Sequence, residues 1–214
     1  MSMINKLKQW FADLKAYPLL TLEATQEGRA VWVVMAGACV FLLGSAMGFF
    51  QVFLEMDPCE NCVYIRFSQF CILIAGVMMI VNPKNKVIKV IGLALAWYGI
   101  VYGMDKSIIL SGQHVASHAS DSGLDLFQSG QGANACSLEP TFPLGLPLHE
   151  WLPFEFAPSG ICGEDDWALF GLNMAQYCII SYTVFIACAL PLTVAFITKS
   201  LRGGSFFTKT LRES

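Results

Sequence analysis

Four stretches of this chain are apolar over a length that can cross a lipid bilayer, and they constrain the fold more than any other feature. A membrane-spanning helix needs roughly 17 to 25 mainly apolar residues. The sequence predicts four such helices, at about residues 30–54, 62–81, 87–110 and 169–198. Only 14% of the 214 residues are charged, against about 25% in soluble domains. We therefore expect an all-α membrane protein that folds as an antiparallel bundle of four transmembrane helices.

The distribution of basic residues predicts the orientation of this bundle. Cytoplasmic segments of membrane proteins retain an excess of Lys and Arg. Eleven of the 13 basic residues fall in the N-terminal arm, the turn between the second and third stretches, and the tail: Lys6, Lys8, Lys15, Arg29, Lys84, Lys86, Lys89, Lys199, Arg202, Lys209 and Arg212. Residues 55–61 and 111–166 contain none and are acidic. We expect both termini to be cytoplasmic and both acidic segments to face the other compartment.

These expectations divide the chain into three parts. Residues 1–28 form a cytoplasmic arm, in which Ile4, Leu7, Phe11 and Leu14 share one helical stripe, so we expect a short amphipathic helix in the membrane interface. Residues 29–198 form the transmembrane domain, including a long outer loop at 111–168. Residues 199–214 form a cytoplasmic tail.

Composition and motifs exclude several classes of function. A net charge of −3 and a pI near 5.6 provide no basic face for nucleic acid, whose binding depends on clustered Lys and Arg. The sequence has no Gly-rich phosphate loop for nucleotide-driven transport. No histidine occurs in any expected span, and Val63 rather than His follows Cys62, which excludes bis-histidine haem and a c-type haem attachment. We expect no metal site.

The cysteines separate into two groups of four. Cys39, Cys71, Cys178 and Cys188 lie within the expected spans, where a free Cys behaves as a small hydrophobic residue. The other four are Cys59, Cys62, Cys136 and Cys162, and all lie on the outer side, where disulfides persist. An even number on the oxidising side indicates two pairs.

Cys59-Glu60-Asn61-Cys62 stands at the start of the second span. The first turn of a helix presents unpaired N–H groups and the positive end of the helix dipole, which favour a thiolate. Arg66 follows Cys62 by four residues and therefore lies on the same helical face. A guanidinium inside an apolar span either extends to the headgroups or belongs to a functional site. Its position beside two cysteines favours the functional site.

The long outer segment has two parts of different composition. Residues 111–135 are rich in Ser, Gly, Gln and Asn, and we expect them to be mobile. Between Cys136 and Cys162 the chain is apolar and aromatic but interrupted by five prolines. We expect this part to lie on the membrane surface with its aromatic residues in the interface.

Together these features resemble the DsbB family of quinone-linked disulfide-forming membrane proteins, and they are most similar to its DsbI-type branch. The resemblance covers nearly the whole chain from the first span onward. It rests on Cys59-x-x-Cys62 with Arg66 four residues later, on Cys136 and Cys162 enclosing Phe142-Pro143 and Trp151-Leu152-Pro153, and on Trp167, Phe170-Gly171-Leu172, Met174 and Gln176. Ile65 departs from the pattern, since the family commonly has Glu immediately before the arginine.

The resemblance implies a bacterial inner-membrane protein that reoxidises a periplasmic thioredoxin-fold thiol oxidase of the DsbA or DsbL type. It implies that Cys136 forms a mixed disulfide with this donor, that Cys162 then attacks Cys59, and that Cys62 and Arg66 serve a quinone, either ubiquinone or menaquinone. The catalytic residues implied are therefore Cys59, Cys62, Arg66, Cys136 and Cys162. We expect a monomer in contact with membrane lipid and the quinone pool.

A four-span scaffold of the tetraspanin type is the alternative from another class. It explains the topology and a structural role for Cys136 and Cys162, but not Cys59, Cys62 and Arg66. The Cys-Cys-Gly sequence typical of that group is absent.

Overall fold

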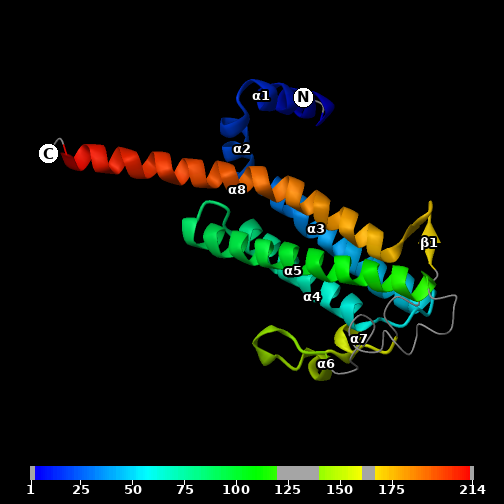
Figure 1. Cartoon of the computed structure of the whole chain (residues 1–214). Helices are drawn as coiled ribbons and strands as arrows, with labels where there is room; N and C mark the ends of the chain where they lie inside the picture. Colours follow the sequence, from blue (N-terminus) through cyan, green and yellow to red (C-terminus); the bar gives the residue numbers. More distant parts are fainter. Residues whose placement is uncertain (1–2, 120–139, 161–166, 213–214) are drawn as a thin grey trace.

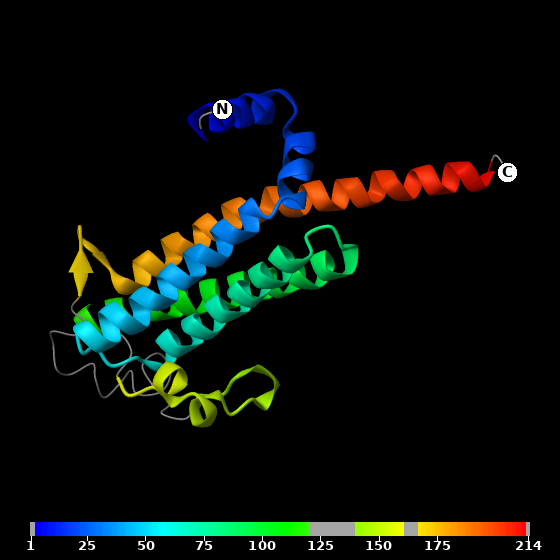
Figure 2. The same cartoon turned by 180° about the vertical axis from the view of Figure 1, so that it is seen from behind.

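The computed structural model describes residues 3–119, 140–160 and 167–212. Four helical segments are long and apolar enough to cross a membrane, namely Ala30–Phe53, Glu60–Val81, Lys86–Val115 and Met174–Leu201. The protein is mostly helical, and the long helices lie side by side as a bundle (Figures 1 and 2). The expected all-α architecture with four spans is confirmed.

The first span changes its helical geometry before it ends. Helix α3 (Ala30–Gly44) continues as η1 (Ser45–Phe53), which is wound as a π-helix. Such wider turns are rare and occur often at functional sites. Helix α4 (Glu60–Val81) ends where expected, directly before Asn82-Pro83.

Two predicted boundaries are wrong. Helix α5 (Lys86–Ala119) runs on past Leu110, so the start of the segment predicted to be a mobile loop is helical. This extension contains no proline, and the buried Gln113 continues its inward face. Helix α8 (Met174–Arg212) begins after residue 169, because β1 (Ala168–Leu169) and β2 (Leu172–Asn173) form an antiparallel hairpin.

The hairpin turn has the conformation that glycine favours. Gly171 has a φ of 79° and Phe170 a φ of 51°, and positive φ at both central residues is typical of the tightest hairpin turns. Phe170 at the tip is almost fully exposed. The turn thus interrupts the apolar stretch that the sequence presents as continuous from residue 169.

The bundle is organised around α4, which packs against both α3 and α5, while α8 packs against α5. Tyr182 of α8 is completely buried, and its hydroxyl bonds with Ser68 and with the carbonyl oxygen of Ile65 in α4. A Cβ at Gly103 of α5 would overlap the Tyr182 ring. The glycine therefore permits the close approach of α4, α5 and α8.

The N-terminal arm consists of two helices where one was predicted, α1 (Met3–Ala16) and α2 (Pro18–Glu27). The chain changes direction at Tyr17, immediately before Pro18. Glu27 at the end of α2 forms an ion pair with Lys199 of α8. Both termini lie toward the end of the bundle that carries the α4–α5 turn (Figures 1 and 2).

The segment 140–160 lies beside α4 and contains three short helices, η3 (Pro143–Gly145), α6 (Leu148–Trp151) and α7 (Pro153–Phe156). Phe142 and Phe156 are buried against Val63 and Tyr64 of α4. The prediction that the aromatic residues face the interface is therefore wrong for these two phenylalanines, which pack into the protein. Trp151, Leu152 and Phe154 are exposed as the prediction requires.

Candidate active site

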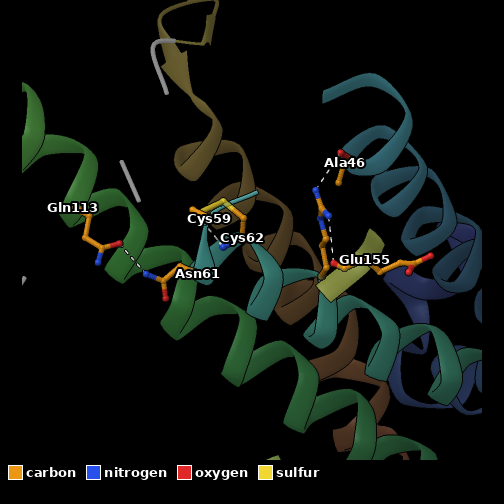
Figure 3. Close-up of a disulfide and its surroundings, with 7 residues drawn as sticks. Ala46, Cys59, Asn61, Cys62, Gln113 and Glu155 are labelled. Atoms are coloured by element: carbon orange, nitrogen blue, oxygen red, sulfur yellow. Dashed lines mark hydrogen bonds between the residues drawn. A yellow bond between two sulfur atoms is a disulfide. The ribbon is translucent and has the colours of Figure 1, made fainter. Parts of the chain in front are cut away.

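A disulfide joins Cys59 and Cys62 at the N-terminus of α4 (Figure 3). Cys59 is the residue that caps the helix, and its Sγ accepts a hydrogen bond from the backbone N–H of Cys62 at 3.2 Å. The first-turn amides of a helix otherwise lack partners. The cap therefore directs an N–H group and the positive end of the helix dipole toward the sulfur atoms, as the sequence predicts.

The amide of Asn61, between the two cysteines, connects this turn to α5. Its Nδ2 donates a hydrogen bond to Oε1 of Gln113 at 2.8 Å (Figure 3). Both residues are buried. The pair fixes the cysteine turn to the extended end of α5, in the part of that helix predicted to be loop.

Arg66 is buried, with 4% of its surface exposed. Its Nη1 donates to Oε1 of Gln51 at 2.7 Å. Nη1 also donates to the carbonyl oxygen of Glu155 at 3.3 Å, and Nη2 donates to the carbonyl oxygen of Ala46 at 3.4 Å; these two bonds are drawn as dashed lines in Figure 3. These acceptors come from η1 and α7. The guanidinium is therefore held inside the protein, which contradicts the reading of Arg66 as an anchor that extends to the headgroups.

A cavity of about 350 Å³ lies between the first span, α4, the hairpin and the start of α8. Cys62 and Arg66 both line it, which is the juxtaposition that their spacing predicts. The remaining wall is mainly apolar and aromatic, with Phe41, Phe49 and Trp167 among its residues. This composition is typical of small-molecule sites, in which a few polar groups orient an apolar ligand.

The two cysteines differ in what they face. Cys62 lines the 350 Å³ cavity, whereas Cys59 lines a small adjoining hollow together with Met56, Asp57 and Pro58. Cys62 and Arg66 line both spaces. The disulfide thus lies at the boundary between the cavity and the outer segment.

The outer segment 157–160 is bound to the chain next to Cys59. The backbone N–H groups of Ser159 and Gly160 donate to the carbonyl oxygen of Pro58 at 3.0 and 3.1 Å, and Oγ of Ser159 donates to Asp57 at 2.9 Å. We call this contact the Pro58 clamp. Cys162 itself lies outside the described residues and follows Gly160 by two positions in the sequence.

The other predicted residues have different outcomes. Cys136 also lies outside the described residues, so the structure does not place it. Cys39 and Cys71 are buried as expected for packing residues, Cys178 is half-buried and Cys188 is exposed. The described parts of the chain contain no group of three or more His, Cys, Asp or Glu that could hold a metal ion.

Comparison with known proteins agrees with this geometry. The sequence model of the family described as "Disulfide bond formation protein DsbB" matches residues 28–192. The chain belongs to the DsbB family. Together with the four apolar helices, this membership identifies a multi-pass membrane protein of the DsbI type and argues against a tetraspanin-type scaffold.

Relatives of DsbI type cover most of this DsbB-family chain. A Shewanella oneidensis protein that carries the name DsbI is 52% identical over 193 residues, which are 89% of this chain and 91% of that protein. The protein-disulfide oxidoreductase DsbI of Salmonella typhimurium is 38% identical over 226 residues, covering 92% and 98% of the two chains. That of Lelliottia amnigena is 44% identical over 172 residues, covering 80% and 75%.

Sequence reasoning missed three features of this DsbB-family site: Gln51, Gln69 and the Pro58 clamp. Both glutamines are amides within expected apolar spans, and a polar side chain in a membrane span signals a functional site. Gln69 also follows Cys62 by seven residues, so it shares the helical face of Cys62 and Arg66. The clamp had no sequence signal, because it joins backbone groups far apart in the chain.

Proposed function

We propose that this protein is a thiol–quinone oxidoreductase. It reoxidises a periplasmic thioredoxin-fold thiol oxidase of the DsbA or DsbL type and passes two electrons to a membrane quinone, either ubiquinone or menaquinone. The observation that carries the proposal is that Cys62, one half of a disulfide, and the buried cation Arg66 line the same apolar cavity.

The residues of the cavity fit a quinone. Its aromatic and apolar wall suits a flat apolar ring, while Arg66 supplies N–H donors for a ring oxygen. When bound, the quinone supplies an acceptor for two electrons and two protons. The fixed positive charge of Arg66, close to Cys62 along the same face of α4, favours the thiolate form of Cys62 over the thiol.

Thiol–disulfide exchange would bring electrons to this pair. A donor thiolate attacks the Cys136–Cys162 disulfide at Cys136 and releases Cys162 as a thiolate. Cys162 attacks Cys59 and breaks the Cys59–Cys62 bond, which leaves Cys62 as a thiolate. The second thiol of the donor attacks the donor–Cys136 disulfide, which releases the oxidised donor and leaves Cys136 as a thiolate. Cys136 then attacks the sulfur of Cys162 and displaces Cys59. The outer disulfide is thereby restored, and Cys59 and Cys62 hold the two electrons.

The Pro58 clamp supports the second exchange step. It holds Gly160 against Pro58, so the chain leading to Cys162 starts beside the chain leading to Cys59. Preorganisation of this kind lowers the entropic cost of bringing the two sulfur atoms together. Cys59 is accordingly the better target for Cys162, and Cys62, in the cavity wall, is the better electron donor.

The remaining assignments belong to the same proposal. The protein acts as a monomer in the bacterial inner membrane, in contact with lipid and the quinone pool. Residues 1–28 and 199–214 are cytoplasmic, and the outer segment with Cys136 and Cys162 is periplasmic. The excess of basic residues at the end of the bundle with both termini supports this orientation.

The direct test uses purified protein, a reduced DsbA-type oxidase and a short-chain benzoquinone. We expect donor oxidation and quinol formation in equal amounts, with both lost in Cys62→Ser. Cys188→Ser is the matched control, because Cys188 is exposed on α8 and does not line the cavity. Wild-type protein that forms no quinol under these conditions would refute the proposal.

A further inference from the structure

Gln69 completes a polar face on α4 that is directed into the cavity. Cys62, Arg66 and Gln69 follow one another at spacings of four and three residues, and all three line the cavity wall. Gln69 is buried, with 6% of its surface exposed. It lies about 4.5 Å further along the helix axis than Arg66, given the rise of about 1.5 Å per residue.

The side-chain oxygen of Gln69 has no hydrogen-bond partner among the described residues. Other polar side chains in the wall already bond within the protein. Ser45 donates to the carbonyl oxygen of Phe41, Ser181 to that of Tyr177, and Tyr177 to that of Leu169, each at 2.8 Å. A buried amide oxygen without a partner destabilises a fold. Because this oxygen lies in the cavity wall, a ligand in the cavity can supply the missing hydrogen bond.

We propose that Gln69 binds the quinone head group through a hydrogen bond between its carboxamide and a ring oxygen. This inference rests on the proposed function and extends it to a second polar contact beside Arg66. A carboxamide carries both a donor and an acceptor. Its Nε2 can donate to the carbonyl of the oxidised ring, and its Oε1 can accept from the hydroxyl of the reduced ring. One side chain therefore serves both redox states, whereas Arg66 can only donate.

The test compares Gln69→Met with a matched substitution, Gln26→Met. Methionine is similar in length to glutamine and lacks the amide. Gln26 is buried in α2, and its side-chain oxygen and nitrogen likewise have no partners among the described residues, but it does not line the cavity. Equilibrium binding of decyl-ubiquinone and its quinol is measured by quenching of tryptophan fluorescence, since Trp167 lines the cavity. Thermal unfolding is measured without quinone.

We expect Gln69→Met to weaken binding of both ligands about three- to tenfold, the range for loss of one hydrogen bond. The same variant should unfold at an equal or higher temperature, because an unsatisfied polar group is removed. Gln26→Met should show the same change in unfolding with unchanged binding. Single-turnover oxidation of reduced donor without added quinone should be unchanged in both variants.

Two results separate this inference from the proposed function. If Gln69→Met and the shorter amide variant Gln69→Asn both bind the two ligands with the affinity of the wild-type protein, the role of Gln69 is overturned and the proposed function still stands. Absence of quinone binding and reduction in the wild-type protein would refute both. Loss of thermal stability in Gln69→Met but not in Gln26→Met would also overturn the inference, because Gln69 would then support the fold.

Discussion

Nη1 of Arg66 donates a hydrogen bond of 2.7 Å to Oε1 of Gln51, and Nε2 of Gln51 donates in turn to the carbonyl oxygen of Phe154 at 3.1 Å. Gln51 thus connects the cation on α4 to the outer segment. Gln51 lies in the π-helical segment η1 at the end of the first span. Charge-assisted hydrogen bonds are stronger than neutral ones, so this pair orients the guanidinium at the cavity.

Substitution of Arg66 should affect the quinone side of the reaction more than the donor side. Arg66→Lys keeps a charge but loses the planar guanidinium, which donates hydrogen bonds to Gln51, Ala46 and Glu155. We expect about a tenfold rise in the quinone concentration needed for half-maximal rate, and a larger loss in Arg66→Met, which removes the charge. The measurement is steady-state quinone reduction beside single-turnover donor oxidation. Unchanged quinone kinetics in both variants would mean that Arg66 does not bind the quinone.

Replacement of Cys162 by Ser should trap the donor on this protein. The thiol that leaves in the first exchange and then attacks Cys59 is missing, so a mixed disulfide between Cys136 and the donor should accumulate. Non-reducing electrophoresis followed by peptide mapping identifies the linked cysteines. Cys188→Ser provides the control, with no trapped species. Capture of the donor through Cys59 would reverse the proposed order of exchange.

Gly160→Val should disturb the Pro58 clamp. A Cβ at this position would lie 2.5 Å from the carbonyl oxygen of Asp57 and 3.0 Å from its carbon, and backbone atoms cannot move away cheaply. We expect exchange between Cys162 and Cys59 to slow about tenfold, since effective concentration depends on this positioning. Rapid-quench thiol trapping measures the step. Gly37→Val is the control, because nothing lies within 4 Å of a Cβ there. Equal rates in both variants would mean that the clamp does not guide exchange.

Reporter fusions test the orientation. Fusions after Asn85, in the α4–α5 turn, and at the C-terminus should behave as cytoplasmic, whereas a fusion near Ser120 should behave as exported. Alkaline phosphatase and a fluorescent protein give opposite signals in the two compartments. A cytoplasmic signal at Ser120 would put the outer cysteines in a reducing compartment and refute the redox proposal.

The ion pair between Glu27 and Lys199 should make a small contribution to stability that acid removes. The hydrogen bond and charge of Lys199 lower the pKa of the Glu27 carboxyl. A lowered pKa stabilises the fold above the pKa of the unfolded carboxyl, about 4.3, and this stability is lost as pH falls through the folded pKa. Both side chains are more than 40% exposed, so we expect at most about 0.5 kcal/mol.

The measurement for this pair is thermal unfolding in detergent at pH 7 and pH 3. Glu27→Gln should unfold at a slightly lower temperature than wild type at pH 7 and at the same temperature at pH 3. If the difference in unfolding temperature between wild type and Glu27→Gln grows as the pH falls, the ion pair does not stabilise the fold as stated.

The helices and the chemistry of the cysteine turn could be predicted from the sequence because they depend on local interactions. A run of apolar residues long enough to cross a bilayer is one continuous stretch, and Pro83 ends α4 through its own ring and missing N–H. The spacing from Cys62 to Arg66 sets a shared helical face whatever the surrounding fold. At the end of α5 the composition suggested a loop, but packing continues the helix. At the hairpin the composition suggested a helix, but the positive φ of Phe170 and Gly171 forms a turn.

By itself, the sequence determined four apolar spans, a pair of cysteines at the start of a helix and a cation one helical turn after them. Only the tertiary structure decided what surrounds them. Gln51 and Phe154 are 103 residues apart, and Pro58 and Gly160 are 102 apart, so their contacts follow from how the helices and the outer segment pack. The cavity arises in the same way, because its wall combines the first span, α4, the hairpin and α8. Such contacts have no local pattern in the chain, since each depends on side-chain shape and backbone direction in segments that meet only after folding.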